Sequence, residues 1–142
     1  MYPVQSIGAM DDSGYTTDVE LRYRDLDTMG HVNNAVYATF IEQARLDYFE
    51  TVAGVPLEEA GGVIAHLEID YERPITLDDD VAVTTEIAEL GEKSISMDHE
   101  ILADGAVAAT ANVVQITVDP ETGETIPIPP EWRDRIATQQ DD

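Results

Sequence analysis

Apolar residues in the first half of the chain recur at helical spacing. Five of them follow one another at intervals of three, one, three and four residues: Tyr37, Phe40, Ile41, Ala44 and Tyr48. Because an α-helix has 3.6 residues per turn, this spacing places all five side chains on one face. The pattern predicts a half-buried helix over residues 34–52, which Gly54 and Pro56 terminate.

The other apolar positions alternate with polar ones, which is typical of half-buried strands. Before the helix, residues 17–24 alternate, with Val19 and Leu21 on one face and charged residues on the other. After the helix, alternation and turn residues predict four further strands, at residues 63–71, 81–90, 94–102 and 106–118. Pro74, after Arg73, ends the first of these four or marks it as an edge strand.

The predicted order is strand, long helix and four strands joined by short turns. Short turns imply that successive strands are antiparallel neighbours. One helix and one antiparallel sheet give an α+β two-layer domain, with the sheet curled around the helix. We expect residues 1–142 to form a single domain, with a loose lead-in over residues 1–16 and a C-terminal tail over residues 129–142. The tail begins a short helix at its prolines, and its last four residues are expected to fray.

The charge balance is strongly acidic and narrows the range of partners. Thirty Asp and Glu residues stand against seven Lys and Arg residues, which gives a formal net charge of −23. We expect no nucleic-acid partner, because binding to phosphate depends on Lys and Arg. Such a surface resembles that of proteins from salt-loving organisms, since at about 1 M salt the Debye length is about 3 Å and self-repulsion is screened.

Cysteine content and hydropathy exclude further classes. The chain has no cysteine, so disulfides, cysteine nucleophiles and thiolate metal sites are excluded. It shows neither a signal-peptide pattern nor an apolar run of membrane-spanning length. We therefore expect a cytoplasmic protein with no membrane partner.

A polar cluster lies between the first strand and the helix. Asp25, Asp27, His31, Asn33 and Asn34 fall within ten residues. A helix N-terminus carries unpaired N–H groups and about half a positive charge, which stabilise a nearby carboxylate or the oxyanion of a bound carbonyl. Either aspartate is a capping or turn residue, or one of them activates water or attacks a carbonyl that the helix polarises. Asn33 is placed to cap the helix.

His31 leaves three interpretations open. It is a base, a metal ligand, or a loop histidine hydrogen-bonded to the backbone, the last being the most frequent role of a lone histidine. A metal site formed by Asp27, His31 and Glu42 is the weakest of these interpretations, and we expect no metal.

The polar cluster and the helix resemble the signature of the hotdog-fold acyl-CoA thioesterases, in the 4-hydroxybenzoyl-CoA thioesterase-like branch. The resemblance rests on the run from Arg24 to Tyr37 and on Glu42, Ala44 and Arg45 in the helix. It covers nearly the whole chain after residue 16, including residues 70–74, 93–94, 106–123 and 128–129. It implies a long central helix wrapped by a five-stranded antiparallel sheet. It also implies hydrolysis of an acyl-CoA thioester to a free acid and coenzyme A, without a separate cofactor.

The resemblance also implies residue roles. Asp27 matches the family's catalytic carboxylate, which acts as nucleophile or as general base on water. The backbone N–H at the start of the helix, assigned to Asn34, polarises the thioester carbonyl, and Asp25 supports the loop. His31 and Asn33 shape the loop, with His31 among the catalytic residues and Asn33 among the substrate-binding ones.

Two rival functions stay open. One is a non-catalytic acyl-CoA-binding module, and the other is a hotdog-type enoyl-CoA hydratase or dehydratase. Related hydratases place aspartate and histidine five residues apart with an intervening Asn-Pro, whereas Asp27 and His31 are four apart without a proline. Met29 stands where plant acyl-carrier-protein thioesterases have a catalytic asparagine, so that mechanism is not supported.

Coenzyme A carries phosphates, so the few cations of this acidic chain are informative. Arg73 and Lys93 are the predicted phosphate contacts, with pairing to one of the many carboxylates as the alternative. The resemblance implies a homodimer with active sites between subunits, or a homotetramer. Four large residues either line an acyl pocket or belong to the core: Tyr37, Phe40, Phe49 and Met97.

Overall fold

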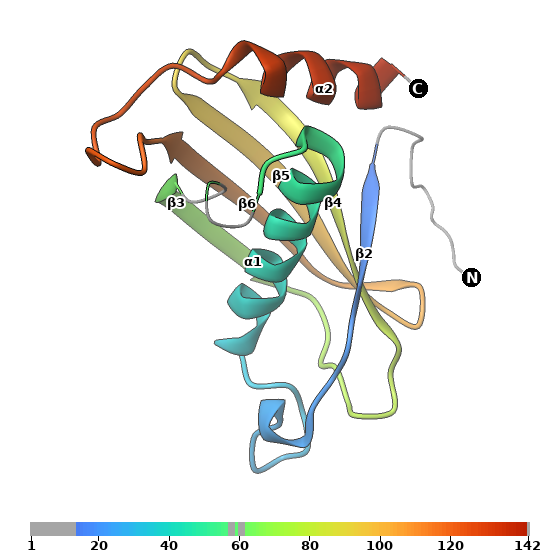
Figure 1. Cartoon of the computed structure of the whole chain (residues 1–142). Coiled ribbons are helices and arrows are strands. Elements are labelled where there is room, and N and C mark those ends of the chain that lie inside the picture. The colour runs from blue at the N-terminus through green and yellow to red at the C-terminus, as the bar shows by residue number, and fades with distance from the viewer. Residues whose placement is uncertain (1–13, 57–58, 60–61, 142) are drawn as a thin grey trace.

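The computed structural model describes residues 14–56, 59 and 62–141. The elements follow in the order β2 (Tyr15–Val19), a 3₁₀ turn (Tyr23–Asp25), α1 (Val36–Tyr48), a π-helical segment (Phe49–Ala53), β3 (Gly62–Tyr71), β4 (Val81–Leu90), β5 (Ser94–Ala103), β6 (Ala106–Thr117) and α2 (Pro130–Asp141). All strands pair antiparallel in the order β2-β4-β5-β6-β3, and α1 lies across one face of the sheet (Figure 1). The predicted α+β architecture of a central helix and a five-stranded sheet is confirmed. Residues 1–13 of the predicted lead-in lie outside the described residues.

The central helix begins two residues later than predicted and ends where predicted. α1 and the π-helical segment together span 18 residues, about 27 Å. They end at Gly54, whose φ of +70° is the left-handed conformation that glycine adopts most easily at a helix C-terminus. All five residues of the predicted apolar stripe are buried, none more than 3% exposed.

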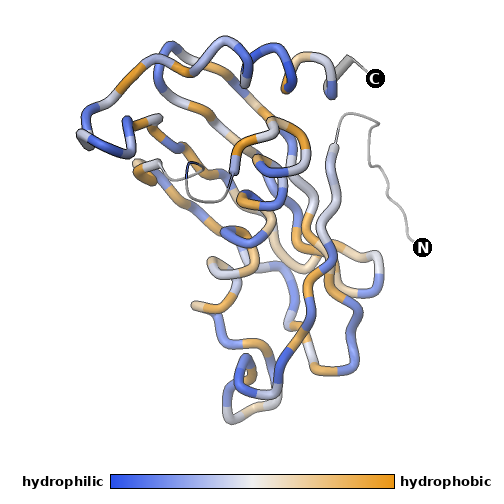
Figure 2. Tube along the Cα trace, in the orientation of Figure 1, coloured by the Kyte–Doolittle hydropathy of each residue, from blue (hydrophilic) through white to orange (hydrophobic). Residues whose placement is uncertain are grey.

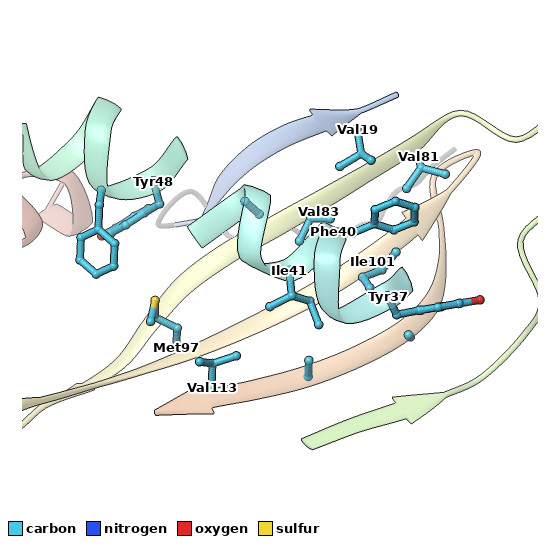
Figure 3. Packing of buried hydrophobic residues seen from close by; sticks show 14 of the residues in the cluster. Val19, Tyr37, Phe40, Ile41, Tyr48, Val81, Val83, Met97, Ile101 and Val113 are labelled. Atoms are coloured by element: carbon cyan, nitrogen blue, oxygen red, sulfur yellow. The ribbon is translucent and has the colours of Figure 1, made fainter. Parts of the chain in front are cut away.

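The core lies between this helix face and the inner face of the sheet (Figure 3). Phe40 and Ile41 point from α1 toward Val83, Ile101 and Val113 on the strands. Apolar and polar residues alternate along the strands (Figure 2), so the apolar side chains gather on the face of the sheet that packs against the helix. The four large residues with two open interpretations belong to this core, at most 3% exposed: Tyr37, Phe40, Phe49 and Met97.

The first strand begins two residues earlier than predicted, at Tyr15 inside the predicted lead-in, and ends five residues earlier. β2 ends at Val19, where its partner β4 begins at Val81, so the residues that follow have no strand to pair with. The chain leaves the sheet and forms the 3₁₀ turn, and Tyr23 is 82% exposed. Alternation alone did not reveal this end, because the end is set by the length of the partner strand.

Successive strands are not all neighbours, contrary to the prediction. β4–β5 and β5–β6 are adjacent, but β3 lies at the far edge of the sheet and pairs with β6 only. Residues 72–80 therefore cross from that edge to β4. The interpretation of Pro74 as the mark of an edge strand is confirmed.

The C-terminal tail forms a helix over its whole described length. α2 starts at Pro130, as its prolines predict, and anchors through Ile136, which is fully buried. Trp132 packs against Phe49, with ring centroids 6.0 Å apart. The helix continues to Asp141, and fraying of the last four residues stays a prediction. No described helix is long and apolar enough to cross a membrane.

A buried histidine on β5 gives the fold a pH dependence. His99 is 2% exposed, and its Nδ1 lies 3.1 Å from the carbonyl oxygen of Thr84 and 3.2 Å from the hydroxyl of Thr85. Burial disfavours the charged ring, and nearby Arg45 adds to the effect, so the pKa of His99 falls to about 4. The folded protein therefore holds His99 neutral.

We expect the free energy of unfolding to fall by about 3 kcal/mol from His99 alone as the pH drops from about 6.5 to about 4. In that window the unfolded histidine takes up a proton and the folded one does not. Urea unfolding across this range, for wild type, His99→Gln and His66→Gln, checks it. His66 is half exposed and serves as the matched control. If the free energy of unfolding changed with pH by the same amount in wild type and His99→Gln, the prediction would be contradicted.

Candidate active site

The polar cluster folds as a tight turn closed by backbone hydrogen bonds. Leu26 and Val32 form a β-bridge, and the N–H of Asp27 donates to the carbonyl of His31 at 2.7 Å. Inside it, the N–H of Gly30 donates to the carbonyl of Asp27 at 3.1 Å, with Gly30 at a φ of +80°. That conformation is open to glycine at little cost, so this residue makes the turn possible.

One carboxylate oxygen of Asp27 is fixed by this turn and the other is not. Oδ1 accepts the N–H groups of Met29 at 2.8 Å and His31 at 3.1 Å. Oδ2 has no hydrogen-bond partner among the described residues, and the side chain is exposed. The turn and chemical interpretations of Asp27 are therefore compatible, since one oxygen sets the geometry and the other remains available to a ligand.

Asp25 forms hydrogen bonds to residues on both sides of the turn, unlike Asp27. Its Oδ2 accepts the N–H of Arg22 at 2.9 Å, and its carbonyl accepts the N–H of Asn33 at 2.8 Å. These bonds join the 3₁₀ turn to the start of the segment that leads into α1. The contacts agree with a supporting role for Asp25.

The crossover segment, residues 72–80, holds the turn from the other side. The N–H of Val32 donates to the carbonyl of Ile75 at 2.8 Å, and His31 forms a β-bridge with Thr76. Ile75 is fully buried. Neither anchoring residue was predicted from the sequence, where the one signal is a short, mostly apolar stretch, Ile75 to Leu77, between Pro74 and a run of acids.

Asn33 organises the turn before the helix, although it is not the N-cap residue. Residues 34 and 35 form a turn ahead of the helix, so the N-cap position is Ala35, whose methyl side chain cannot accept a cap bond. Oδ1 of Asn33 accepts the N–H of Ala35 at 2.9 Å, and its carbonyl accepts that of Val36 at 2.9 Å. The side chain thus satisfies a backbone donor as predicted, two residues earlier than a cap would.

The N–H of Asn34 is left free by these bonds. The neighbouring N–H groups of Asn33, Ala35 and Val36 all have partners, whereas that of Asn34 has none among the described residues. The first turn of α1 contains no acidic residue, so nothing there offsets the positive end of the helix dipole. An exposed, unpaired donor therefore lies directly ahead of the helix.

His31 lies in the same loop, half buried. Its backbone is bonded on both sides, but its ring has no hydrogen-bond partner among the described residues. Within the described part of the chain, no group of three or more histidine or acidic side chains is arranged to hold a metal ion.

Arg73 and Lys93 lie at opposite ends of the sheet. The N–H of Arg73 bonds to the carbonyl of Ala108, near the start of β6. The carbonyl of Lys93 accepts the N–H of Thr117, nine residues further along β6, which is about 30 Å of strand. Of these two residues, Arg73 lies at the end of the sheet nearer to Asp27.

Neither cation forms an ion pair with a described carboxylate. Nη2 of Arg73 donates to the carbonyl of Ala103 at 2.7 Å, and Nζ of Lys93 donates to the hydroxyl of Thr125 at 3.3 Å. The arginines with a carboxylate partner in the described part of the chain are Arg22, beside Glu20, and Arg45, beside Glu42. Both positive charges therefore remain available to an anion.

A groove of about 310 Å³ runs between α1 and β3. Its lining combines apolar side chains with three polar side chains of the helix: Ala38, Ile41, Ile64, Leu67, Val113, Thr39, Glu42 and Arg45. Ala38 follows Asn34 by four residues, so the groove begins about one helical turn from the free N–H.

Comparison with known proteins finds relatives over most of the chain. The model of the thioesterase-like superfamily matches residues 21–136. The long-chain acyl-CoA thioesterase FadM of Escherichia coli K12 is 29% identical over 125 residues, which cover 84% of this chain and 95% of FadM. The acyl-CoA thioesterase YbgC of Haemophilus influenzae is 32% identical over 113 residues, which cover 76% of this chain and 83% of YbgC.

Solved structures share the fold. A thioesterase from Thermus thermophilus, in complex with coenzyme A and zinc, is 38% identical with a TM-score of 0.82, covering 89% of this chain and 94% of that chain. A DHNA-CoA thioesterase from Staphylococcus aureus is 26% identical with a TM-score of 0.79, covering 90% of this chain and 91% of that chain. The family resemblance and the hotdog fold are confirmed.

We expect Gly30→Ala and Gly123→Ala to lower the free energy of unfolding by a similar amount, about 1 kcal/mol each. Both glycines have positive φ, +80° and +75°, and a Cβ on either would meet nothing within 4 Å, so alanine adds backbone strain without a clash. Urea unfolding measures both losses. Only Gly30→Ala should shift the backbone amide NMR signals of Asp27 and His31. A much larger loss for Gly30→Ala would contradict the view that this glycine supplies backbone conformation alone.

Proposed function

Because the chain belongs to the thioesterase-like superfamily, we propose that it is an acyl-CoA thioesterase, which hydrolyses a thioester to a free carboxylic acid and coenzyme A. Its relatives FadM and YbgC are acyl-CoA thioesterases. One observation carries the proposal: the same loop contains a free backbone donor and a carboxylate with one free oxygen. The donor is the N–H of Asn34, and the carboxylate is that of Asp27.

The two groups fit the two needs of thioester cleavage. The carbonyl oxygen gains negative charge as the carbon is attacked, and a fixed N–H beside a helix N-terminus stabilises that charge. Oδ2 of Asp27 either takes a proton from the attacking water or attacks the carbonyl carbon itself, after which water cleaves the acyl–aspartate bond. In both routes the C–S bond breaks and the sulfur leaves as coenzyme A with a proton from water.

His31 and Asn33 complete the proposed site. The ring of His31 has no described partner and belongs to the turn that fixes Asp27, which supports the proposal that it contacts a bound thioester. Asn33 holds the turn that leaves the Asn34 donor free.

The groove between α1 and β3 supplies the proposed acyl site. It begins about one helical turn from the Asn34 donor, and five of its eight lining residues are apolar, which suits a hydrocarbon chain or ring.

We propose a homodimer formed by edge-to-edge pairing of β3. Both faces of this ten-residue edge strand are open to solvent, and Val63, Leu67 and Tyr71 are 55%, 44% and 48% exposed. An open edge with apolar side chains favours pairing with another strand. A twofold axis across the joined sheets makes the two β3 strands antiparallel.

The proposed dimer would bring the two proposed phosphate contacts, Arg73 and Lys93, to one site. Antiparallel pairing places the Lys93 end of one sheet beside the Arg73 end of the other. Arg73 of one subunit and Lys93 of the partner subunit then bind the same coenzyme A, at a site that neither subunit forms alone. Assembly to a homotetramer would leave this pairing intact.

We expect Asp27→Asn to reduce kcat for acyl-CoA hydrolysis by about 10²- to 10⁴-fold. Asparagine keeps an oxygen for the two N–H bonds of the turn and removes the negative charge. Asp119→Asn is a matched control, because Oδ1 of Asp119 likewise accepts two backbone N–H groups, from Glu121 and Thr122. Thiol release from a panel of acyl-CoAs at high salt measures the rates. Equal rates for Asp27→Asn and wild type, or hydration of enoyl-CoA without thioester cleavage, would contradict the proposal.

Wild type should sediment at high salt with at least twice the 15.6 kDa mass of the chain. Val63→Lys should raise the dissociation constant of the dimer at least tenfold, because each β3 interface then contains two added charges. Leu77→Lys is the control, since Leu77 is similarly exposed at 44% but lies in the crossover. Sedimentation velocity over a concentration series checks both variants. A monomeric wild type, or equal weakening by both substitutions, would contradict the β3 interface.

A further inference from the structure

Tyr71, the last residue of β3, connects the edge of the sheet to the loop ahead of α1. Its hydroxyl donates a hydrogen bond to the backbone carbonyl of Asn34 at 2.8 Å, across 37 residues of sequence. Among the described side chains, this is the one bond that joins β3 to the turn before the helix. It reaches the residue whose N–H is left free.

The ring of Tyr71 is held in place by the core. It meets the ring of Tyr37 edge to face, with centroids 4.8 Å apart and an interplanar angle of 75°. Tyr37 is 2% exposed and belongs to the first turn of α1. The hydroxyl of Tyr71 therefore has a defined position, although 48% of the residue is exposed.

The hydrogen bonds around Asn34 fix the two peptide groups that flank its Cα. The peptide between Asn34 and Ala35 is bonded at both ends, since its carbonyl accepts from Tyr71 and its N–H donates to Asn33 Oδ1 at 2.9 Å. In the peptide between Asn33 and Asn34, the carbonyl accepts the N–H of Val36 at 2.9 Å. Three of the four polar groups are paired, and the fourth is the free N–H of Asn34.

A free donor contributes to catalysis only when its direction is fixed before the reaction, because reorientation during the reaction costs free energy. The N–H of Asn34 belongs to the preceding peptide, which joins the Asn34–Ala35 peptide at the Cα of Asn34. A displacement of that Cα would turn the N–H, and the bond from Tyr71 holds the Asn34 carbonyl against such a displacement from outside the loop. The bonds from Asn33 and Val36 are local and move with the loop.

We propose that Tyr71 is a positioning residue of the thioester site, which fixes the direction of the Asn34 N–H through the Asn34 carbonyl. This inference rests on the proposed function. Tyr71 is not a direct donor to substrate, because its hydroxyl hydrogen is used by Asn34.

The test is Tyr71→Phe, which keeps the ring and its packing on Tyr37 and removes only the hydroxyl. Tyr23→Phe is the matched control, since Tyr23 is 82% exposed and its side chain has no described bond. We expect Tyr71→Phe to lower kcat about tenfold, with KM within twofold of wild type, because the donor acts on the transition state more than on the bound substrate. Its melting temperature should match that of Tyr23→Phe, and only Tyr71→Phe should shift the backbone amide NMR signals of Asn34 and Ala35.

Each outcome separates this inference from the proposed function. Unchanged kcat, or unchanged amide signals of Asn34 and Ala35, in Tyr71→Phe would overturn the positioning role while thioesterase activity of the wild type stands. A fall in kcat accompanied by a rise in KM of the same factor, or by a lower melting temperature, would indicate a structural role for Tyr71. Either result would also overturn the positioning role. Absence of thioesterase activity in the wild type would overturn the proposed function and the positioning role together.

Discussion

Burial of one face of α1 against the sheet is the constraint on which the site depends. Tyr37, Phe40 and Ile41 are at most 3% exposed, so the helix cannot rotate or slide without exposing them. Each large side chain of this kind stabilises the packed state by about 1.5–3 kcal/mol. The fixed helix in turn fixes where its N-terminus leaves the sheet, and the active-site loop is assembled at that point.

The loop is then held from three directions. The crossover binds it through Ile75, the 3₁₀ turn binds it through Asp25, and the edge strand binds it through Tyr71. The groups of this loop without described partners include the N–H of Asn34 and Oδ2 of Asp27, together with the N–H of Thr28 and the ring of His31. Most backbone N–H groups in folded proteins are paired, so the unpaired N–H of Asn34 at the start of the helix is available to a ligand. The strand that carries Tyr71 is also the one proposed to form the dimer, so one strand serves both the assembly and the site.

Local periodicity predicted the helix, its buried face and four of the five strands closely, because each depends on neighbouring residues. It did not predict the end of β2 at Val19 or the crossover between β3 and β4, because both depend on which strand lies alongside. Asp27 and Asn34 were identified by a family resemblance, and what distinguishes them physically lies in three-dimensional pairing. The free N–H of Asn34 is evident only once the partners of Asn33, Ala35 and Val36 are known. The anchoring residues Ile75 and Tyr71 gave almost no sequence signal, since their contacts lie more than thirty residues away.

The most direct measurement is a crystal structure with an acyl-CoA analogue in which a methylene group replaces the thioester sulfur, so that the ketone binds without being cleaved. We expect the ketone oxygen to lie about 2.7–3.1 Å from the backbone nitrogen of Asn34. We also expect the ketone carbon to face Oδ2 of Asp27, and the acyl group to occupy the groove between α1 and β3. A ketone oxygen bonded elsewhere, with the Asn34 N–H still unpaired, would contradict the proposed site.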